Sequence, residues 1–104
     1  MYDITLIIGV YIDNAIQAAK ISKEKYIVLD IDYDNKSIVF SFSNTYSGTI
    51  DLNKLDDIKY TTKGIGHGYG LVIVKETLEK NNSLDQCREI NGKYYVQKLV
   101  VKAN

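Results

Sequence analysis

The sequence has no proline and no tryptophan, and its 104 residues include a single cysteine and a single histidine. Cys87 alone cannot form an internal disulfide bond, and no cysteine–histidine cluster has the spacing of a zinc site. Acidic and basic residues number 13 each, so the formal net charge is zero, which argues against broad binding to nucleic acid or anionic membranes. These absences best fit a protein of the reducing cytoplasm.

Long hydrophobic runs are absent as well. The apolar run over residues 6–12 is far shorter than the ~20 residues that cross a bilayer, and Asp3 stands where a signal peptide carries positive charge. Apolar residues still make up 45 % of the chain, which is ordinary for a globular protein with a hydrophobic core. We therefore expect a single domain over residues 1–104.

Two stretches have the three-to-four apolar spacing of a helix with one buried face, the first over residues 3–21 and the second over about 68–80. The buried stripe predicted for the first helix consists of Ile4, Ile8, Ile12, Ala15 and Ala19. The connection over residues 45–66 has no clear strand, although residues 51–58 fit a short helix. A segment of this length often works as a lid or a binding loop.

Four stretches alternate apolar and polar residues, as strands with one buried face do. They cover residues 26–33, 37–44, 84–90 and 93–102. The turn-forming sequences Asp34-Asn35-Lys36 and Asn91-Gly92 join these strands into two hairpins. The order helix, hairpin, loop, helix, hairpin predicts an α+β fold, a two-layer sandwich with a mostly antiparallel sheet and helices on one face.

Four of the seven glycines stand at every second position in Lys63–Leu71, written KGIGHGYGL, directly before the second predicted helix. Glycine lets a ligand approach the backbone, and the first turn of a helix has unpaired N–H groups and a positive partial charge. Together these features predict a phosphate site at the helix start. The dinucleotide, P-loop and protein-kinase glycine patterns do not fit this spacing, so a flexible hinge with a tight turn stays open as the alternative.

Two asparagines strengthen the prediction of a phosphate site. Asn14 lies beside the apolar stripe of the first helix, where its amide oxygen would suit Mg²⁺ shared with phosphates. Asn44 falls on the same strand face as Phe40 and Phe42, so it points between the layers, where a polar side chain needs a partner or a ligand. Alternatively, Asn14 is a partly exposed residue with local hydrogen bonds, and Asn44 ends its strand and starts a turn.

Three stretches, in this order, resemble the ATP-binding domain of the GHKL superfamily, which includes gyrases and histidine kinases. IDNAIQAA resembles the asparagine-box helix, FSFSNTYSG the strand and first glycine box, and TTKGIGHGYGLVIVKETLEK the second glycine box with its helix. Within the superfamily, these stretches are most similar to the C-terminal catalytic domains of quorum-sensing sensor histidine kinases. The resemblance implies the two-layer Bergerat fold, truncated here because the strand and helix that normally come first are missing.

The resemblance also implies a role for each matching position. Asn14 would hold Mg²⁺ against the phosphates of ATP, while Asn44 and Thr45 would contact the adenine, where the family usually has an aspartate. Phosphate contacts are implied for the second glycine box, namely Lys63, Gly64, Gly66, His67, Gly68, Gly70 and Leu71. Val10 stands where efficient ATPases of the superfamily have a carboxylate base, which argues against an ATPase of the gyrase type and is compatible with a kinase.

The implied function is that of an ATP- and Mg²⁺-binding catalytic domain of a two-component sensor histidine kinase. Such a domain donates the γ-phosphoryl group to a histidine on a separate helical domain, so this chain alone is expected not to phosphorylate itself. The implied partners are the acceptor domain and a downstream response regulator, and the implied location is the cytoplasmic portion of a membrane-anchored kinase. The missing strand is expected to leave an apolar sheet face uncovered, with a homodimer or a helix-swapped oligomer as the result.

Two other interpretations stay open. A non-catalytic module of the same fold would bind proteins and have weak or lost nucleotide binding, and it is favoured by a first glycine box that keeps only Gly48. A serine-kinase relative of the fold would act on a protein hydroxyl group. Calorimetry with ATP separates the first of these from a kinase, and the chemistry of the phosphorylated product separates the second.

Overall fold

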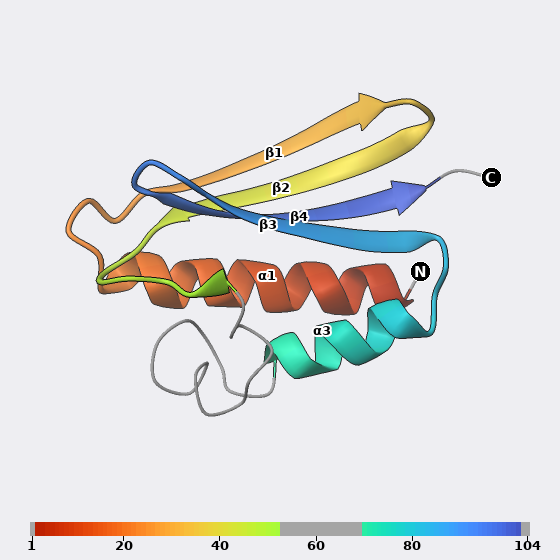
Figure 1. Ribbon diagram of the computed structural model, residues 1–104, viewed down its shortest axis with the longest axis horizontal. Helices are drawn as coiled ribbons and strands as arrows, with labels where there is room; N and C mark the ends of the chain where they lie inside the picture. Colours follow the sequence, from red (N-terminus) through yellow and green to blue (C-terminus); the bar gives the residue numbers. More distant parts are fainter. Residues whose placement is uncertain (1, 53–69, 103–104) are drawn as a thin grey trace.

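The computed structural model describes residues 2–52 and 70–102, which form two layers. One layer is a sheet of four strands, and the other consists of two helices on one face of that sheet (Figure 1). The strands are β1 (Ile27–Asp34), β2 (Ser37–Thr45), β3 (Leu84–Asn91) and β4 (Tyr94–Lys102), and the helices are α1 (Tyr2–Lys20) and α3 (Gly70–Glu79). The predicted α+β sandwich is therefore confirmed.

The predicted short helix over residues 51–58 lies almost wholly outside the described residues. Each of the other predicted helices and strands is present, with bounds within a few residues of the prediction. Neither of the helices α1 and α3, in the part of the chain that the structure describes, is long and apolar enough to cross a membrane.

The strand order is β1-β2-β4-β3, and every neighbouring pair is antiparallel. Directly paired residues of an antiparallel ladder lie on the same face of the sheet, so the register decides which side chains face the helices. Two adjacent rows on the helix-facing side are Leu29–Phe42–Gln97 and Ile27–Asn44–Tyr95. The predicted inward direction of Asn44 follows from this register.

Both hairpins close with two-residue turns. Asn35 and Lys36 have φ values of 48° and 66°, the pattern of a type I′ turn, which matches the twist of the strands. In the second hairpin Asn91 still belongs to β3 and pairs with Tyr94, so Gly92, with a φ of 62°, takes the first central position. The second turn is thus shifted by one residue from the predicted Asn91-Gly92, because glycine adopts that backbone conformation at the lowest cost.

The hydrophobic core lies between the helices and the strands β2, β4 and β3. The fully buried apolar side chains at its centre are Ile7, Tyr11, Val74, Tyr95 and Leu99. Burial of each such side chain contributes ~1.5–3 kcal/mol. The ring of Tyr11 meets that of Phe42 edge-to-face, with 5.5 Å between the centroids.

Two members of the predicted stripe of α1, Ala15 and Ala19, are buried as predicted, with 2 % and 3 % exposed. The other three, Ile4, Ile8 and Ile12, pack at the margin of a core that is centred on Ile7 and Tyr11, and for these three the prediction is corrected. The physical reason is that α1 packs against α3 as well as against the sheet, so its buried face is turned toward α3.

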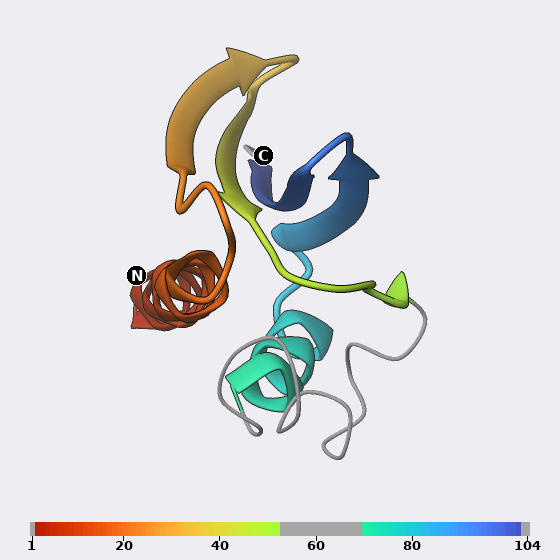
Figure 2. The ribbon, with the colours of Figure 1, turned by 90° about the vertical axis from the view of Figure 1, so that its left-hand side faces the viewer.

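β1 forms one edge of the sheet, and α1 packs mainly on β2. The side chains of β1 on the helix-facing side therefore stay exposed, with 56 % for Leu29, 69 % for Ile31 and 70 % for Tyr33. Seen end-on, β1 curves away from the helical layer (Figure 2). β1 therefore carries exposed apolar side chains at an edge of the sheet.

Candidate functional site

The start of α3 lies against the middle of α1. The two helices run in opposite directions, so Gly70, the first residue of α3, comes beside Val10 and Asn14 (Figure 1). A Cβ atom placed on Gly70 would lie 3.0 Å from Val10 Cγ1 and 3.9 Å from Asn14 Oδ1. The missing side chain of Gly70 thus keeps open a small space between the amide oxygen of Asn14 and the N-terminus of α3.

This position has the electrostatics of an anion and metal site. The first turn of a helix offers N–H donors without intrahelical partners, together with a positive partial charge. Asn14 is only 1 % exposed, and its amide oxygen is a hard ligand of the kind that Mg²⁺ accepts. Within residues 2–52 and 70–102 no group of three or more His, Cys, Asp or Glu is placed to hold a metal. A cation bound here would have Asn14 Oδ1 as one protein ligand.

Asn44, at the end of β2, is buried with its amide in a defined orientation. Its Nδ2 atom donates a hydrogen bond of 2.9 Å to the carbonyl oxygen of Thr45. A carbonyl oxygen only accepts hydrogen bonds, so Nδ2 and not Oδ1 must face Thr45. The atom that Asn44 presents on its other side is consequently Oδ1, a hydrogen-bond acceptor without a formal charge.

The two asparagines lie at the same end of the layered structure. α1 and β2 run in the same direction (Figure 1), and the contact between Tyr11 and Phe42 fixes their relative position. Asn14 follows Tyr11 by ~4.5 Å along the helix axis, three residues at 1.5 Å each. Asn44 follows Phe42 by ~6.6 Å along the strand, two residues at 3.3 Å each. Both amides are thus displaced from the aromatic contact in one direction, between α1 and the sheet.

A cluster of hydroxyl groups joins the end of α1 to the end of β2. Ser22 Oγ lies 2.6 Å from Thr45 Oγ1, and it also donates to the carbonyl oxygen of Ala19 at 2.7 Å. The backbone N–H groups of Lys25 and Tyr26 donate to these two hydroxyl oxygens at 3.0 and 2.9 Å. The hydroxyl of Thr45 is therefore engaged within the fold, and its predicted contact with adenine stays a prediction.

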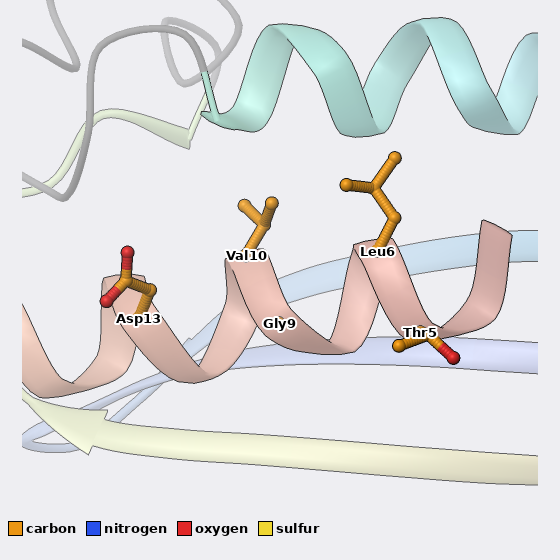
Figure 3. Close-up of a pocket in the computed structure, with 5 residues that line it drawn as sticks. All are labelled: Thr5, Leu6, Gly9, Val10 and Asp13. Carbon is orange, nitrogen blue, oxygen red and sulfur yellow. The ribbon is translucent and has the colours of Figure 1, made fainter. Parts of the chain in front are cut away.

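An open groove of about 380 Å³ runs along α1 on the side next to α3. Leu6 and Val10 line it and point toward α3, and Asp13 stands at one end (Figure 3). Val10 has no atom that accepts a proton, and its Cγ1 lies close to Gly70. In efficient ATPases of the superfamily this position is expected to hold a catalytic carboxylate. Here it is occupied by the apolar side chain of Val10, which packs against the start of α3.

Lys63, Gly64, Gly66, His67 and Gly68 lie outside the described residues, and so does most of the predicted lid. Leu71 belongs to the first turn of α3. Of the predicted site residues that are described, Asn14 and Gly70 come together, and Asn44 lies at the same end of the two layers.

Sequence reasoning missed a set of buried polar groups on the helix-facing side of the sheet. Tyr95 pairs with Asn44, and its hydroxyl accepts a hydrogen bond of 2.8 Å from Gln97 Nε2. Tyr11 donates its hydroxyl to Gln86 Oε1 at 2.6 Å. The available signal was the alternation in β4, which puts Gln97 on the same face as Leu99. Tyr11, Tyr95 and Gln97 are almost fully buried, and their polar atoms need hydrogen-bond partners, which Gln97 and the half-buried Gln86 supply.

The layered fold, the buried asparagine of α1 and the glycine at the start of α3 are consistent with a nucleotide-binding domain of the GHKL type. The model of the GHKL domain family matches residues 1–102, so this chain belongs to the GHKL domain family. A search of curated proteins found no match. The domain is thus an ATP-binding domain of the GHKL superfamily, whose members typically bind ATP with Mg²⁺.

The residues present suit that ligand. Asn14 Oδ1 is a hard oxygen beside the space left open by Gly70, and the first turn of α3 provides N–H donors for phosphate. Asn44 Oδ1 is a buried hydrogen-bond acceptor, of the kind that an amino group on a base would need. These three features come from α1, α3 and β2, so the site depends on the packing of both helices on the sheet.

Proposed function

We propose that this chain is the ATP- and Mg²⁺-binding catalytic domain of a two-component sensor histidine kinase. It would donate the γ-phosphoryl group to a histidine on a separate helical domain, which in turn feeds a response regulator. The observation that carries the proposal is the meeting of Asn14 Oδ1 with the glycine start of α3. Membership of the GHKL family supports ATP as the ligand.

The phosphate end of the nucleotide is assigned to α1 and α3. Asn14 would hold Mg²⁺, and the bound metal supplies neutralisation of phosphate charge and orientation of the γ-phosphoryl group. The N–H groups at the start of α3 would bind phosphate oxygens, with Gly70 leaving room for them. Positioning and charge neutralisation are the main requirements of phosphoryl transfer, and these groups meet them without a general base.

The base end is assigned to Asn44. Its Oδ1 would accept a hydrogen bond from the exocyclic amino group of adenine, because the contact of Nδ2 with Thr45 fixes which atom is presented. Guanine has a carbonyl oxygen at that place, so two acceptors would face each other and ATP is preferred over GTP. A neutral hydrogen bond contributes ~0.5–1.5 kcal/mol, against ~1.5–3 kcal/mol for a charged acceptor, so binding of the base is weaker than with an aspartate.

The transfer moves one phosphoryl group between two nucleophiles. The bond from the γ-phosphorus to the oxygen that bridges to the β-phosphorus breaks, and a bond forms between that phosphorus and an imidazole nitrogen of the acceptor. ADP leaves with the electron pair, and the imidazole ring loses its proton to solvent. Val10 offers no base to activate a water molecule at this position, which supports transfer to a protein acceptor over hydrolysis.

Two measurements test the proposal. Calorimetry with a non-hydrolysable ATP analogue should give binding that needs Mg²⁺, and γ-labelled ATP should label an acceptor-histidine domain supplied in trans with an acid-labile phosphate. Acid-stable label on serine would replace the histidine kinase by a serine kinase. If a folded sample binds no nucleotide, the remaining interpretation is a protein-interaction module of the same fold. As part of the same proposal, the domain lies in the cytoplasmic portion of a membrane-anchored kinase. This part is withdrawn if the histidine kinase assignment fails.

A further inference from the structure

The groove along α1 begins beside the place assigned to the phosphates of ATP. We call it the α1 groove, and its lining residues are Thr5, Leu6, Gly9, Val10 and Asp13. Val10 belongs to both places, since it lines the groove and also contacts the start of α3 at Gly70. Asp13, at one end of the groove, directly precedes Asn14 in the chain (Figure 3). A molecule that fills the groove therefore extends to the phosphate site.

Gly9 forms the floor of the α1 groove. The other lining residues stand one position or one turn away from it, so they surround it on the surface of the helix. A Cβ atom added to Gly9 would meet nothing within 4 Å in the described part of the chain. A glycine inside a helix costs roughly 0.5–1 kcal/mol relative to alanine. No contact among the described residues requires this cost, whereas a missing side chain lets another helix approach α1 closely.

The walls of the α1 groove are apolar. Leu6 and Val10 are half-buried and point toward α3 (Figure 3). Ile73 follows Gly70 by one turn, so it lies on the face of α3 that is turned to α1, and it is 41 % exposed. The groove has a volume of about 380 Å³, whereas a cavity of ~150 Å³ takes one benzene ring. It therefore has room for the apolar side chains of an amphipathic helix.

The position of the groove indicates which helix this is. In the proposed function the acceptor histidine has to reach the γ-phosphoryl group, which is assigned to the space between Asn14 and the start of α3. Gly9 lies ~7.5 Å from Asn14 along the axis of α1, five residues at 1.5 Å each. A helix along the groove thus places its histidine at the phosphate site and an apolar residue, one to two turns away, over Gly9. The exposed carboxylate of Asp13 lies between these points and favours a basic residue there.

We propose that the α1 groove is the docking site of the helix that carries the acceptor histidine. This inference rests on the proposed function and adds the surface and the sequence pattern of the partner. The pattern is an apolar side chain one to two turns from the histidine, with a lysine or arginine near the histidine. A small contact area is sufficient because the acceptor domain belongs to the same kinase, and a tethered partner has an effective concentration in the millimolar range.

Phosphoryl transfer to the acceptor domain in trans, measured over a range of acceptor concentrations, tests the docking site. Gly9→Leu fills the groove with a side chain whose Cβ atom has open space, so the fold and the affinity for the ATP analogue should not change. The KM for the acceptor domain should rise at least about 10-fold, because the apolar side chain of the partner can no longer be buried there.

Two control variants separate groove filling from other effects. Gly9→Ala stabilises α1 about as much as Gly9→Leu does but adds a single carbon atom, so the rise in KM should be much smaller. Glu79→Leu places the same side chain at an exposed position of α3 on the face opposite Gly70, and the KM should stay unchanged. Amide NMR of the natural chain, titrated with the acceptor domain, should show shifts at residues 5–13 and at Ile73.

The outcomes distinguish this inference from the proposed function. If the natural chain labels the acceptor histidine and Gly9→Leu labels it with the same KM, the docking site is wrong and the proposed function stands. Equal rises in KM for Gly9→Ala and Gly9→Leu would assign the effect to the stiffness of α1 and would also overturn the docking site. If the natural chain binds no ATP or labels no histidine, the proposed function fails and the docking site fails with it.

Discussion

Two neighbouring regions of the molecule distribute polar and apolar side chains in opposite ways. The ends of α1 and β2 bury polar side chains, whereas the adjacent strand β1 exposes apolar ones. Asn44 and Asn14 are 2 % and 1 % exposed, whereas Ile31 and Tyr33 are 69 % and 70 % exposed. Burial of an amide costs free energy unless its hydrogen bonds are replaced, and an exposed apolar side chain gives up ~25 cal/mol per Å² that burial would gain. The first region therefore points to a small polar ligand and the second to a protein surface.

The largest effect should come from the buried asparagine of α1. Asn14→Leu keeps the volume but removes the amide oxygen, so Mg²⁺-dependent ATP affinity should fall by at least about 100-fold, given that even the outer partners of a metal contribute 10–100-fold. Calorimetry in Mg²⁺ and in EDTA measures it, and the variant and the natural chain should differ little in EDTA. If the variant binds ATP in Mg²⁺ as tightly as the natural chain does, Asn14 is not a metal ligand and its burial does not indicate a ligand site.

At the end of β2 the expected effect is smaller and concerns the base. Asn44→Leu should weaken ATP binding about 10-fold, the equivalent of one neutral hydrogen bond, and should abolish the preference for ATP over GTP. Asn44→Asp serves as the matched control, since it keeps an acceptor and should retain the preference for ATP. Competition binding with ATP and GTP measures both variants. A natural chain that binds the two nucleotides equally would contradict the assigned orientation of the amide.

The glycine at the start of α3 gives a prediction in which affinity and stability change in different ways. Gly70→Ala would place a Cβ 3.0 Å from Val10 Cγ1 and close to Asn14 Oδ1, so ATP affinity should fall severalfold. The contact with Val10 costs stability, whereas alanine lowers the entropy of the unfolded chain, so the free energy of unfolding should change by less than about 1 kcal/mol. Adding Val10→Ala makes space for the new methyl group, and the double variant should recover part of the lost affinity. If Val10→Ala restores none of the ATP affinity lost in Gly70→Ala, the contact between the new methyl group and Val10 is not the cause of that loss.

The smallest effect is expected on β1. Ile31→Thr exchanges an exposed β-branched residue for a polar one, so the free energy of unfolding should change by no more than ~0.5 kcal/mol at low protein concentration. Leu99→Ala, at a fully buried position of β4, is the contrast and should cost ~2–5 kcal/mol. Urea unfolding of both variants measures the difference. A large loss in Ile31→Thr would mean that this side chain is covered in the monomer.

The fold could be predicted because its signals are local. Strand alternation and the turn residues Asn35, Lys36 and Gly92 predicted the two hairpins, and the glycine-rich stretch that ends at Gly70 predicted the start of α3 to within a few residues. The buried face of α1 could not be fixed in the same way, since apolar residues surround much of this helix and the contact with α3 decides the outcome. Periodicity placed Ile31 and Phe42 each on the apolar face of its own strand. It does not contain the position of α1 beneath β2, which leaves Ile31 exposed and Phe42 buried.

The site was predictable in part. Asn14 and Asn44 were identified as polar residues beside apolar stripes, a pattern that local sequence carries. The approach of Gly70 to Asn14 depends on how the two helices pack, which the sequence pattern does not give. The hydrogen bond between Tyr11 and Gln86 joins two different elements. The hydrogen bond between Tyr95 and Gln97 lies within one strand, but alternation alone does not predict it. Tertiary geometry supplied these contacts.

The hydrogen bond between Ser22 Oγ and Thr45 Oγ1 joins the residues that follow α1 to the end of β2. The two amides assigned to opposite ends of the nucleotide sit on these joined elements, so a displacement at one is transmitted to the other. Base recognition and metal recognition should then be energetically coupled: the losses in Asn14→Leu and Asn44→Leu would fail to add in the double variant, and Ser22→Ala would bring them closer to additivity.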